Sequence, residues 1–252
     1  MAGVDIAPKN SPGSPPVDWT GVRRVYKMMQ DLFYLVTEPF GIQLTSSRNR
    51  DLAHLIAGID SLDRNLDILE ELDEREEFSH ALIQYLNGQS ASIESMHATA
   101  EVSDRMMILK EILVRRKIQT QFCETAGRVL KLTEQKRLAA TETDMIRYLK
   151  EEWRLTGDLP VMIMGDESNE RFERFFFLCC EMMTAVDMIQ DARADFREGQ
   201  ISVRPSLTLY LRLLGVFLLP MPVLLWRFPN PLNLFRYAWA FLWHVYGPGD
   251  YV

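Results

Sequence analysis

The 252-residue sequence has little cysteine, few glycines and no excess of basic residues. Its three cysteines, Cys123, Cys179 and Cys180, form no Cys-x-x-Cys pair, so the sequence predicts neither a zinc site nor a thiol-exchange motif. A reducing, cytoplasmic location is therefore expected. The net charge of -7 argues against nucleic-acid binding, which needs clustered Lys and Arg. The first residues contain no apolar run behind a basic start, so no secretory signal is expected.

Strand signals are nearly absent between residues 20 and 200. Apolar residues recur there at intervals of three and four, which is the period of an amphipathic helix. Helices are predicted at residues 20–37, 47–85, 90–123, 124–155 and 168–198, with breaks at 38–41, 87–88, 157–160 and 165–168. Long helices with short connections favour an all-α fold: a single-domain helical bundle over residues 19–252, preceded by a flexible Pro/Gly/Ser-rich tail at 1–18.

Residues 207–246 differ from the rest because Leu, Phe, Trp and Pro dominate them. The longest apolar run, 207–226, is close to the length of a membrane span. Arg212, Gly215, Pro220 and Pro222 interrupt it, however, which disfavours a spanning helix. We expect core helices or a membrane-facing flap, and hence peripheral contact with a membrane through 207–246 rather than insertion across it.

The first of two aspartate clusters comprises Asp60, Asp63 and Asp67. At spacings of three and seven residues the three side chains fall within an arc of about 60° on a helix. Like charges so placed repel one another, and most such faces are simply solvated. Here the preceding residues, from Leu52 to Ile59, are strongly apolar, which indicates that the cluster extends from a buried helix.

The second cluster comprises Asp187, Asp191 and Asp195, which spread over an arc of about 80°. It also comes after an apolar stretch. A divalent cation would offset the repulsion within both clusters, and Mg²⁺ is normally held by one or two carboxylates together with substrate phosphates. We therefore predict Mg²⁺ as the cofactor, held between two facing clusters. The predicted ligands are Asp60, Asp63, Asp67, Asp187, Asp191 and Asp195, of which Asp60, Asp63 and Asp191 are also the predicted catalytic residues.

The second cluster resembles a motif of the squalene and phytoene synthase group, Asn-x-x-Arg-Asp-x-x-x-Asp. Asp187 replaces the Asn of that motif and Gln190 its Arg, and Gly199 and Pro205 are similar to the glycine and proline that trail the motif in that group. The first cluster is similar to the Asp-x-x-Asp-x-x-x-Asp of small bacterial terpene cyclases. The chain thus resembles class I terpenoid synthases around residues 55–70 and 180–205. This resemblance implies a helical bundle of the class I isoprenoid synthase type with a central apolar cavity.

The resemblance also implies a substrate, a linear prenyl diphosphate that is ionised and cyclised. Guanidinium groups bind phosphate oxygens bidentately, so arginines near the second motif are candidate diphosphate ligands: Arg193, Arg197 and Arg204. The carbocation left behind must be shielded from water by an apolar wall. The candidates for this wall are Phe176, Phe177 and Met183.

Alternatives to this function remain open. Head-to-head condensation of two prenyl diphosphates competes with cyclisation of one, and cyclisation is favoured because the second motif lacks the arginine of the condensing enzymes. A non-enzymatic helical interaction protein, with solvated acidic faces and a C-terminal segment that contacts a membrane or a partner, is another interpretation. The sequence permits a homodimer and leaves the substrate length and the product skeleton open.

Overall fold

The computed structural model describes residues 15–69, 71–90 and 98–230. These residues form α-helices and two short 3-10 helices, with no strand among them, so the predicted all-α fold is confirmed for this part of the chain. The α-helices are α1 (Arg24–Thr37), α2 (Ser46–Ile68), α3 (Leu72–Leu86), α4 (Ala100–Arg116), α5 (Gln119–Arg137), α6 (Glu142–Met164), α7 (Glu170–Arg197), α8 (Leu207–Leu218) and α9 (Met221–Arg227). The 3-10 helices are η1 (Glu38–Phe40) and η2 (Gly165–Glu167).

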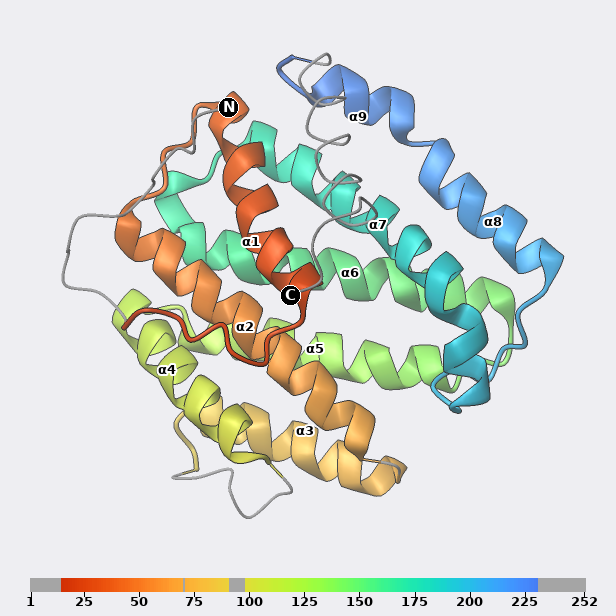
Figure 1. Cartoon of the computed structure of the whole chain (residues 1–252), viewed down its shortest axis with the longest axis horizontal. Helices are drawn as coiled ribbons and strands as arrows, with labels where there is room; N and C mark the ends of the chain where they lie inside the picture. The colour runs from red at the N-terminus through yellow and green to blue at the C-terminus, as the bar shows by residue number, and fades with distance from the viewer. Residues whose placement is uncertain (1–14, 70, 91–97, 231–252) are drawn as a thin grey trace.

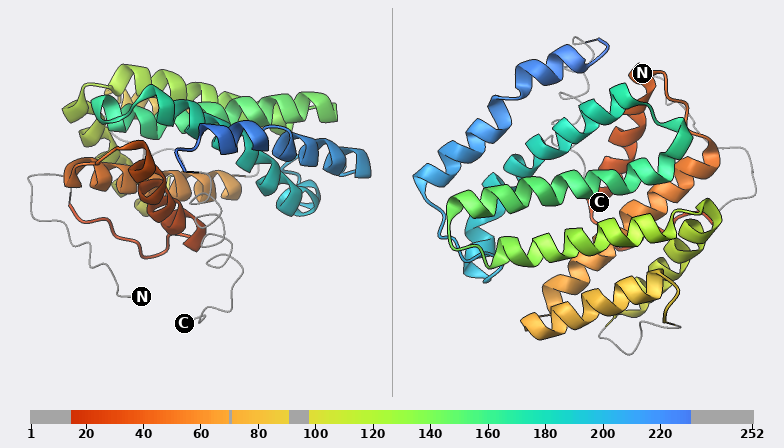
Figure 2. Two further views of the ribbon diagram at one scale, coloured as in Figure 1. Left: turned by 90° about the horizontal axis from the view of Figure 1, so that it is seen from above. Right: turned by 180° about the vertical axis from the view of Figure 1, so that it is seen from behind.

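The helices are arranged around a row in which α5 packs against α6, α6 against α7, and α7 against α8 (Figure 1). Helices α1 and α2 lie across one face of this row, as the view from above shows (Figure 2). Helix α2 packs against α1, α4 and α6. This central position explains why every residue from Asp51 to Gly58 is buried.

Several helices begin at the polar residues that favour N-caps. The side chains of Thr45, Thr99, Thr141, Asn169 and Ser206 each accept a hydrogen bond from a backbone N–H in the first turn of the helix that each precedes. Such caps satisfy donors that the helix itself leaves unpaired. They fix the starts of α2 and α7, the two helices that carry the aspartate motifs.

The end of α7 is set by Gly199, whose φ of 73° is left-handed. The backbone N–H of Gln200 donates to the carbonyl of Asp195 at 2.7 Å, and that of Gly199 donates to the carbonyl of Phe196 at 3.4 Å. This pair of bonds is a Schellman motif, which ends a helix where glycine adopts the left-handed conformation. Asp195 therefore lies in the last turn of α7.

Some predicted helix boundaries are wrong. The predicted helix 47–85 is two helices, because the chain leaves the helical conformation at Leu69 and the buried Arg75 donates to the carbonyls of Leu66 and Leu69. The predicted break at 157–160 does not occur, and α6 continues through Pro160. Packing of α6 between α5, α7 and α2 offsets the hydrogen bond that proline removes.

The boundary predicted at residues 123–124 is also wrong. The chain instead turns at Lys117, whose φ is 60°, and again between Leu138 and Thr141. A left-handed lysine is uncommon, and composition gives no signal for it. The predicted breaks at 38–41, 87–88 and 165–168 are confirmed, and each contains a glycine of positive φ.

Candidate metal and diphosphate site

The first aspartate motif lies on the C-terminal half of α2, and its members have different surroundings. The side chain of Asp60 is fully buried, with 0% of its surface exposed. Its Oδ1 accepts from Nε of Arg23 at 2.5 Å, and its Oδ2 accepts from Nε of Arg64 at 3.2 Å. Arg64 also bonds Glu101 on α4 at 2.7 Å. Asp60 thus ties α2 to the segment before α1 and, through Arg64, to α4.

Asp63 is half-buried, one turn further along α2. Its Oδ2 accepts from Nη2 of Arg23 at 2.5 Å and from the hydroxyl of Tyr26 at 3.4 Å. Burial and the charge of Asp63 raise the pKa of Tyr26, which keeps its phenol protonated as a donor. Asp67 is exposed, and desolvation followed by the charge of Asp63 raises the pKa of its carboxyl.

The second motif lies on the last three turns of α7. Desolvation by the surrounding protein, followed by the charge of Asp191, raises the pKa of Asp187 to about 6. The same two causes, in the same order, raise the pKa of Asp195 to about 6. Repulsion by Asp191 thus adds to the larger effect of burial on both carboxyl groups.

The two motifs are electrostatic neighbours. The charge of Asp63 on α2 contributes to the raised pKa of Asp187 on α7, and that of Asp67 contributes to the raised pKa of Asp195. The two motifs therefore interact electrostatically, with contributions smaller than those of burial and of Asp191. Among the described residues, no group of three or more His, Cys, Asp or Glu side chains is already close enough to enclose a metal ion.

Lys136, near the end of α5, lies close to this acidic region. It forms an ion pair with Glu152 on α6 at 2.9 Å. Burial alone would lower its pKa, but Glu152 and the more distant Asp187 and Asp63 raise it above the usual value. Lys136 in turn lowers the pKa of Asp187 and Asp195, against the larger effects that raise them.

Sequence reasoning missed three cations that interact with the aspartates, namely Arg23, Arg64 and Lys136. Only Arg64 carried a usable signal, because its position after Asp60 has the i,i+4 spacing of helical ion pairs. Arg23 is separated from Asp60 by 37 residues, and Lys136 comes from a different helix. Their positions depend on how α1, α2 and α5 pack.

The predicted diphosphate ligands are placed on the outside of the molecule. Arg193 is exposed on α7, with its guanidinium carbon 5.9 Å from the centre of the Tyr210 ring on α8. Arg197 and Arg204 are exposed at and beyond the end of α7. Their role toward a diphosphate stays a prediction.

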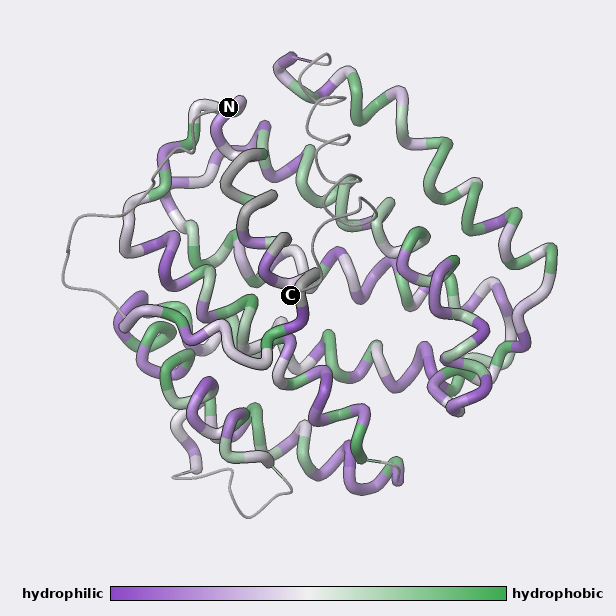
Figure 3. The backbone as a smooth tube through the Cα atoms, viewed as in Figure 1, coloured by the Kyte–Doolittle hydropathy of each residue, from purple (hydrophilic) through white to green (hydrophobic). Residues whose placement is uncertain are grey.

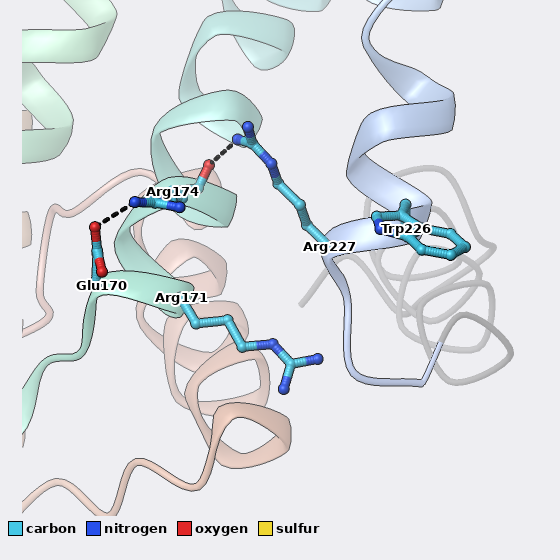
Figure 4. A pocket seen from close by; sticks show the side chains of 5 residues that line it. All are labelled: Glu170, Arg171, Arg174, Trp226 and Arg227. Carbon is cyan, nitrogen blue, oxygen red and sulfur yellow. Dashed lines mark hydrogen bonds and ion pairs between the residues drawn. The ribbon is translucent and has the colours of Figure 1, made fainter.

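The predicted cavity residues contribute to an aromatic cluster. Phe176 stacks on Phe172 with ring centres 5.3 Å apart and meets Phe33 edge-on at 5.2 Å. Phe177 and Met183 are half-buried on α7. Two pockets of the described part lie elsewhere, one between the start of α7 and the end of α9 (Figure 4) and one along α5, α6 and α7 around Arg154. The central apolar cavity stays a prediction.

Comparison with protein-family models, with curated proteins and with solved structures found no match. The functional interpretation therefore depends on the site geometry and on the motif resemblance.

Proposed function

We propose that the protein is a Mg²⁺-dependent class I terpene synthase that ionises a linear prenyl diphosphate, releases diphosphate and cyclises the carbocation. The observation that supports this proposal is the electrostatic interaction between two aspartate motifs on different helices, α2 and α7. An interaction of this kind is expected where two acidic helix faces hold cations for one diphosphate site.

In this proposal a divalent cation would bind at the second motif and at the outer part of the first. Burial, followed by the charge of Asp191, disfavours the ionised forms of Asp187 and Asp195, and Asp63 and Asp67 add smaller effects. Bound Mg²⁺ would neutralise these carboxylates and stabilise the leaving diphosphate as a Lewis acid. Asp191, exposed between its two neighbours on α7, is the remaining oxygen donor of this set.

Asp60 fits a different role. Its carboxylate is buried and accepts from two arginines, so we assign it to positioning Arg23 rather than to metal binding. The side chain of Arg23 is 40% exposed and bridges Asp60 and Asp63. From this position its guanidinium can bind a phosphate group entering the acidic region while Asp60 keeps its orientation.

Lys136 supplies a second fixed positive charge. Because its pKa is raised, its ammonium stays protonated throughout the neutral range. Together with Arg23 it would attract an anionic diphosphate to a region that the aspartates otherwise make negative. This arrangement also explains how a protein of net charge -7 would bind a polyanion.

The test is turnover of a series of linear prenyl diphosphates of increasing length, with and without Mg²⁺, with analysis of hydrocarbon products and released diphosphate. Asp191→Asn keeps the shape of the side chain and removes its charge, so it should lower kcat by about 10²–10³. Asp104→Asn, on the exposed face of α4, is the matched control and should leave turnover unchanged. Full activity of Asp191→Asn, or turnover that does not need Mg²⁺, would refute the proposal.

One observation favours the non-enzymatic alternative, since a buried Asp60 bonded to Arg23 and Arg64 is also typical of a purely structural ion-pair network. Titration with inorganic diphosphate in the presence of Mg²⁺ separates the two. A terpene synthase should bind it and an interaction protein should not. Product analysis then distinguishes cyclisation from head-to-head condensation, because the latter yields a product with twice the carbon content of its substrate.

A further inference from the structure

The outer surface of α8 and α9 carries exposed apolar side chains. Figure 3 shows that most residues of this helix pair, at the edge of the molecule, are hydrophobic. On α8 the exposed leucines have spacings of four, three and four residues, which places them within an arc of about 60°. The stripe continues past the end of α8 onto α9, where Trp226 is 88% exposed. We call this set the outer stripe: Leu207, Leu211, Leu214, Leu218, Leu219, Val223 and Trp226.

The opposite face of the same helices is apolar too, but it is buried. Leu209 and Leu213 pack in one cluster with Ala185 and Met188 of α7. Leu224 and Phe228 pack in another cluster with Phe175. A helix that is apolar all round belongs inside a large core or in lipid, and a water-exposed helix normally has one polar face.

Charge along this part of the chain has one sign. Residues 199–249 contain four arginines and no aspartate, glutamate or lysine, in a protein whose acidic residues outnumber its basic ones. A local excess of arginine beside an apolar surface is the composition that binds an anionic lipid surface.

A pocket of about 320 Å³ lies at the end of the outer stripe (Figure 4). Arg171 and Arg174 reach it from the first turns of α7, and Trp226 and Arg227 from the end of α9. Glu170 pairs with Arg174, and Nη1 of Arg227 donates to the carbonyl of Arg174 at 2.8 Å. Three guanidinium groups and one carboxylate leave the pocket with an excess of positive charge next to an exposed indole.

We propose that α8 and α9 dock on an anionic lipid bilayer. The outer stripe enters the boundary between headgroups and acyl chains, to a depth of about 5–10 Å. Trp226 sits at headgroup level, where indoles are favoured, and Arg171, Arg174 and Arg227 bind lipid phosphates. This inference does not depend on the proposed chemistry, because none of these side chains belongs to the aspartate site.

A docked helix pair fits the structure better than a spanning helix. Leu207–Arg227, 21 residues long, is apolar enough for a span by composition, with an 18-residue window of mean hydropathy 1.9. However, α8 ends at Leu218 and α9 begins only at Met221. Arg212, in the middle of α8, donates to Thr143 at 2.9 Å and lies 3.8 Å from Glu142, which in a spanning helix would place an ion pair inside the hydrocarbon region of the bilayer.

The experiment is flotation of the full-length protein with vesicles of phosphatidylcholine alone and of phosphatidylcholine mixed with phosphatidylglycerol. The parent protein should bind the anionic vesicles and be released by alkaline carbonate. Leu211→Gln combined with Leu218→Gln should weaken binding about tenfold or more without lowering the melting temperature, because both side chains are exposed. The matched control, Met107→Gln combined with Val114→Gln on α4, removes two similarly exposed apolar side chains and should have no effect.

The charged part of the surface is tested separately. Arg171→Gln should weaken binding to anionic vesicles about fivefold and leave the weak binding to phosphatidylcholine unchanged. Arg147→Gln, on the exposed surface of α6, is its control. Sedimentation analysis of the free protein runs in parallel.

Four results would overturn the proposal. The first is that equal amounts of parent protein float with and without anionic vesicles. The second is that vesicle binding survives Leu211→Gln with Leu218→Gln, which would assign the binding to another segment. Resistance to alkaline carbonate would indicate a spanning helix. The fourth result is a parent protein that does not bind vesicles but forms a dimer in solution. If Leu211→Gln with Leu218→Gln converted this dimer to a monomer, a second copy of the chain would cover the outer stripe.

Discussion

Replacement of Asp187 by Asn should make the folded protein more stable at neutral pH. The folded state raises the pKa of this carboxyl from 3.8 to about 6, so the charged form is disfavoured relative to the unfolded chain. A rise of this size corresponds to at most about 3 kcal/mol. Solvent reaches the side chain of Asp187, although the surrounding protein displaces enough water to dominate its pKa. Screening by this solvent reduces the expected gain to about 1 kcal/mol.

The pH dependence of this stabilisation follows from proton linkage. A carboxyl with a raised pKa in the folded state binds its proton more tightly there, so the energetic penalty is absent below pH 3.8 and complete above about pH 6. The advantage of Asp187→Asn over the parent should therefore be largest at pH 7 or above. It should shrink as the pH falls through about 6 and vanish below about 4. At neutral pH a gain of about 1 kcal/mol raises the melting temperature by about 2–4 °C.

The assay is thermal denaturation of the parent, Asp187→Asn and the control Asp104→Asn across this pH range, with and without Mg²⁺. Mg²⁺ should stabilise the parent and have a smaller effect on Asp187→Asn, because the cation and the substitution relieve the same repulsion. A variant that melts below the parent at neutral pH would refute the reasoning. A difference that does not change with pH would refute it equally.

Two further predictions concern packing. Asp60→Asn should lower the free energy of unfolding by about 2–3 kcal/mol in urea denaturation, because it breaks a buried ion pair. Asp51→Asn also breaks a buried ion pair and should cost about as much, but it should leave Mg²⁺-dependent turnover per folded molecule unchanged. If both variants lost turnover equally, Asp60 would have no special role in the site. Gly157→Ala should lower the free energy of unfolding by about 1 kcal/mol, because the new Cβ would lie 2.9 Å from Sγ of Cys180. In a Cys180→Ala background the same substitution should stabilise the fold, because alanine favours the helix over glycine. If the two substitutions had additive effects on stability, the new Cβ on α6 would not clash with Cys180 on α7.

The sequence located the aspartate motifs on helix faces but could not rank their members. The spacing of Asp60, Asp63 and Asp67 treats the three alike, yet Asp60 is fully buried with two arginine partners while Asp67 is exposed. Spacing reports the direction in which a side chain leaves its own helix. It does not report which other segment lies in that direction, and here that segment carries Arg23.

Local properties of the chain were enough to specify the class of fold. The periodicity required helices, polar caps and left-handed glycines placed several of their ends, and the Asp spacing put each set of carboxylates on one face. Packing between distant segments decided that Asp63 pairs with Arg23, that Lys136 pairs with Glu152, and that α6 continues through Pro160. Each of these results depends on contacts between helices distant in sequence, where packing and burial outweigh local preference.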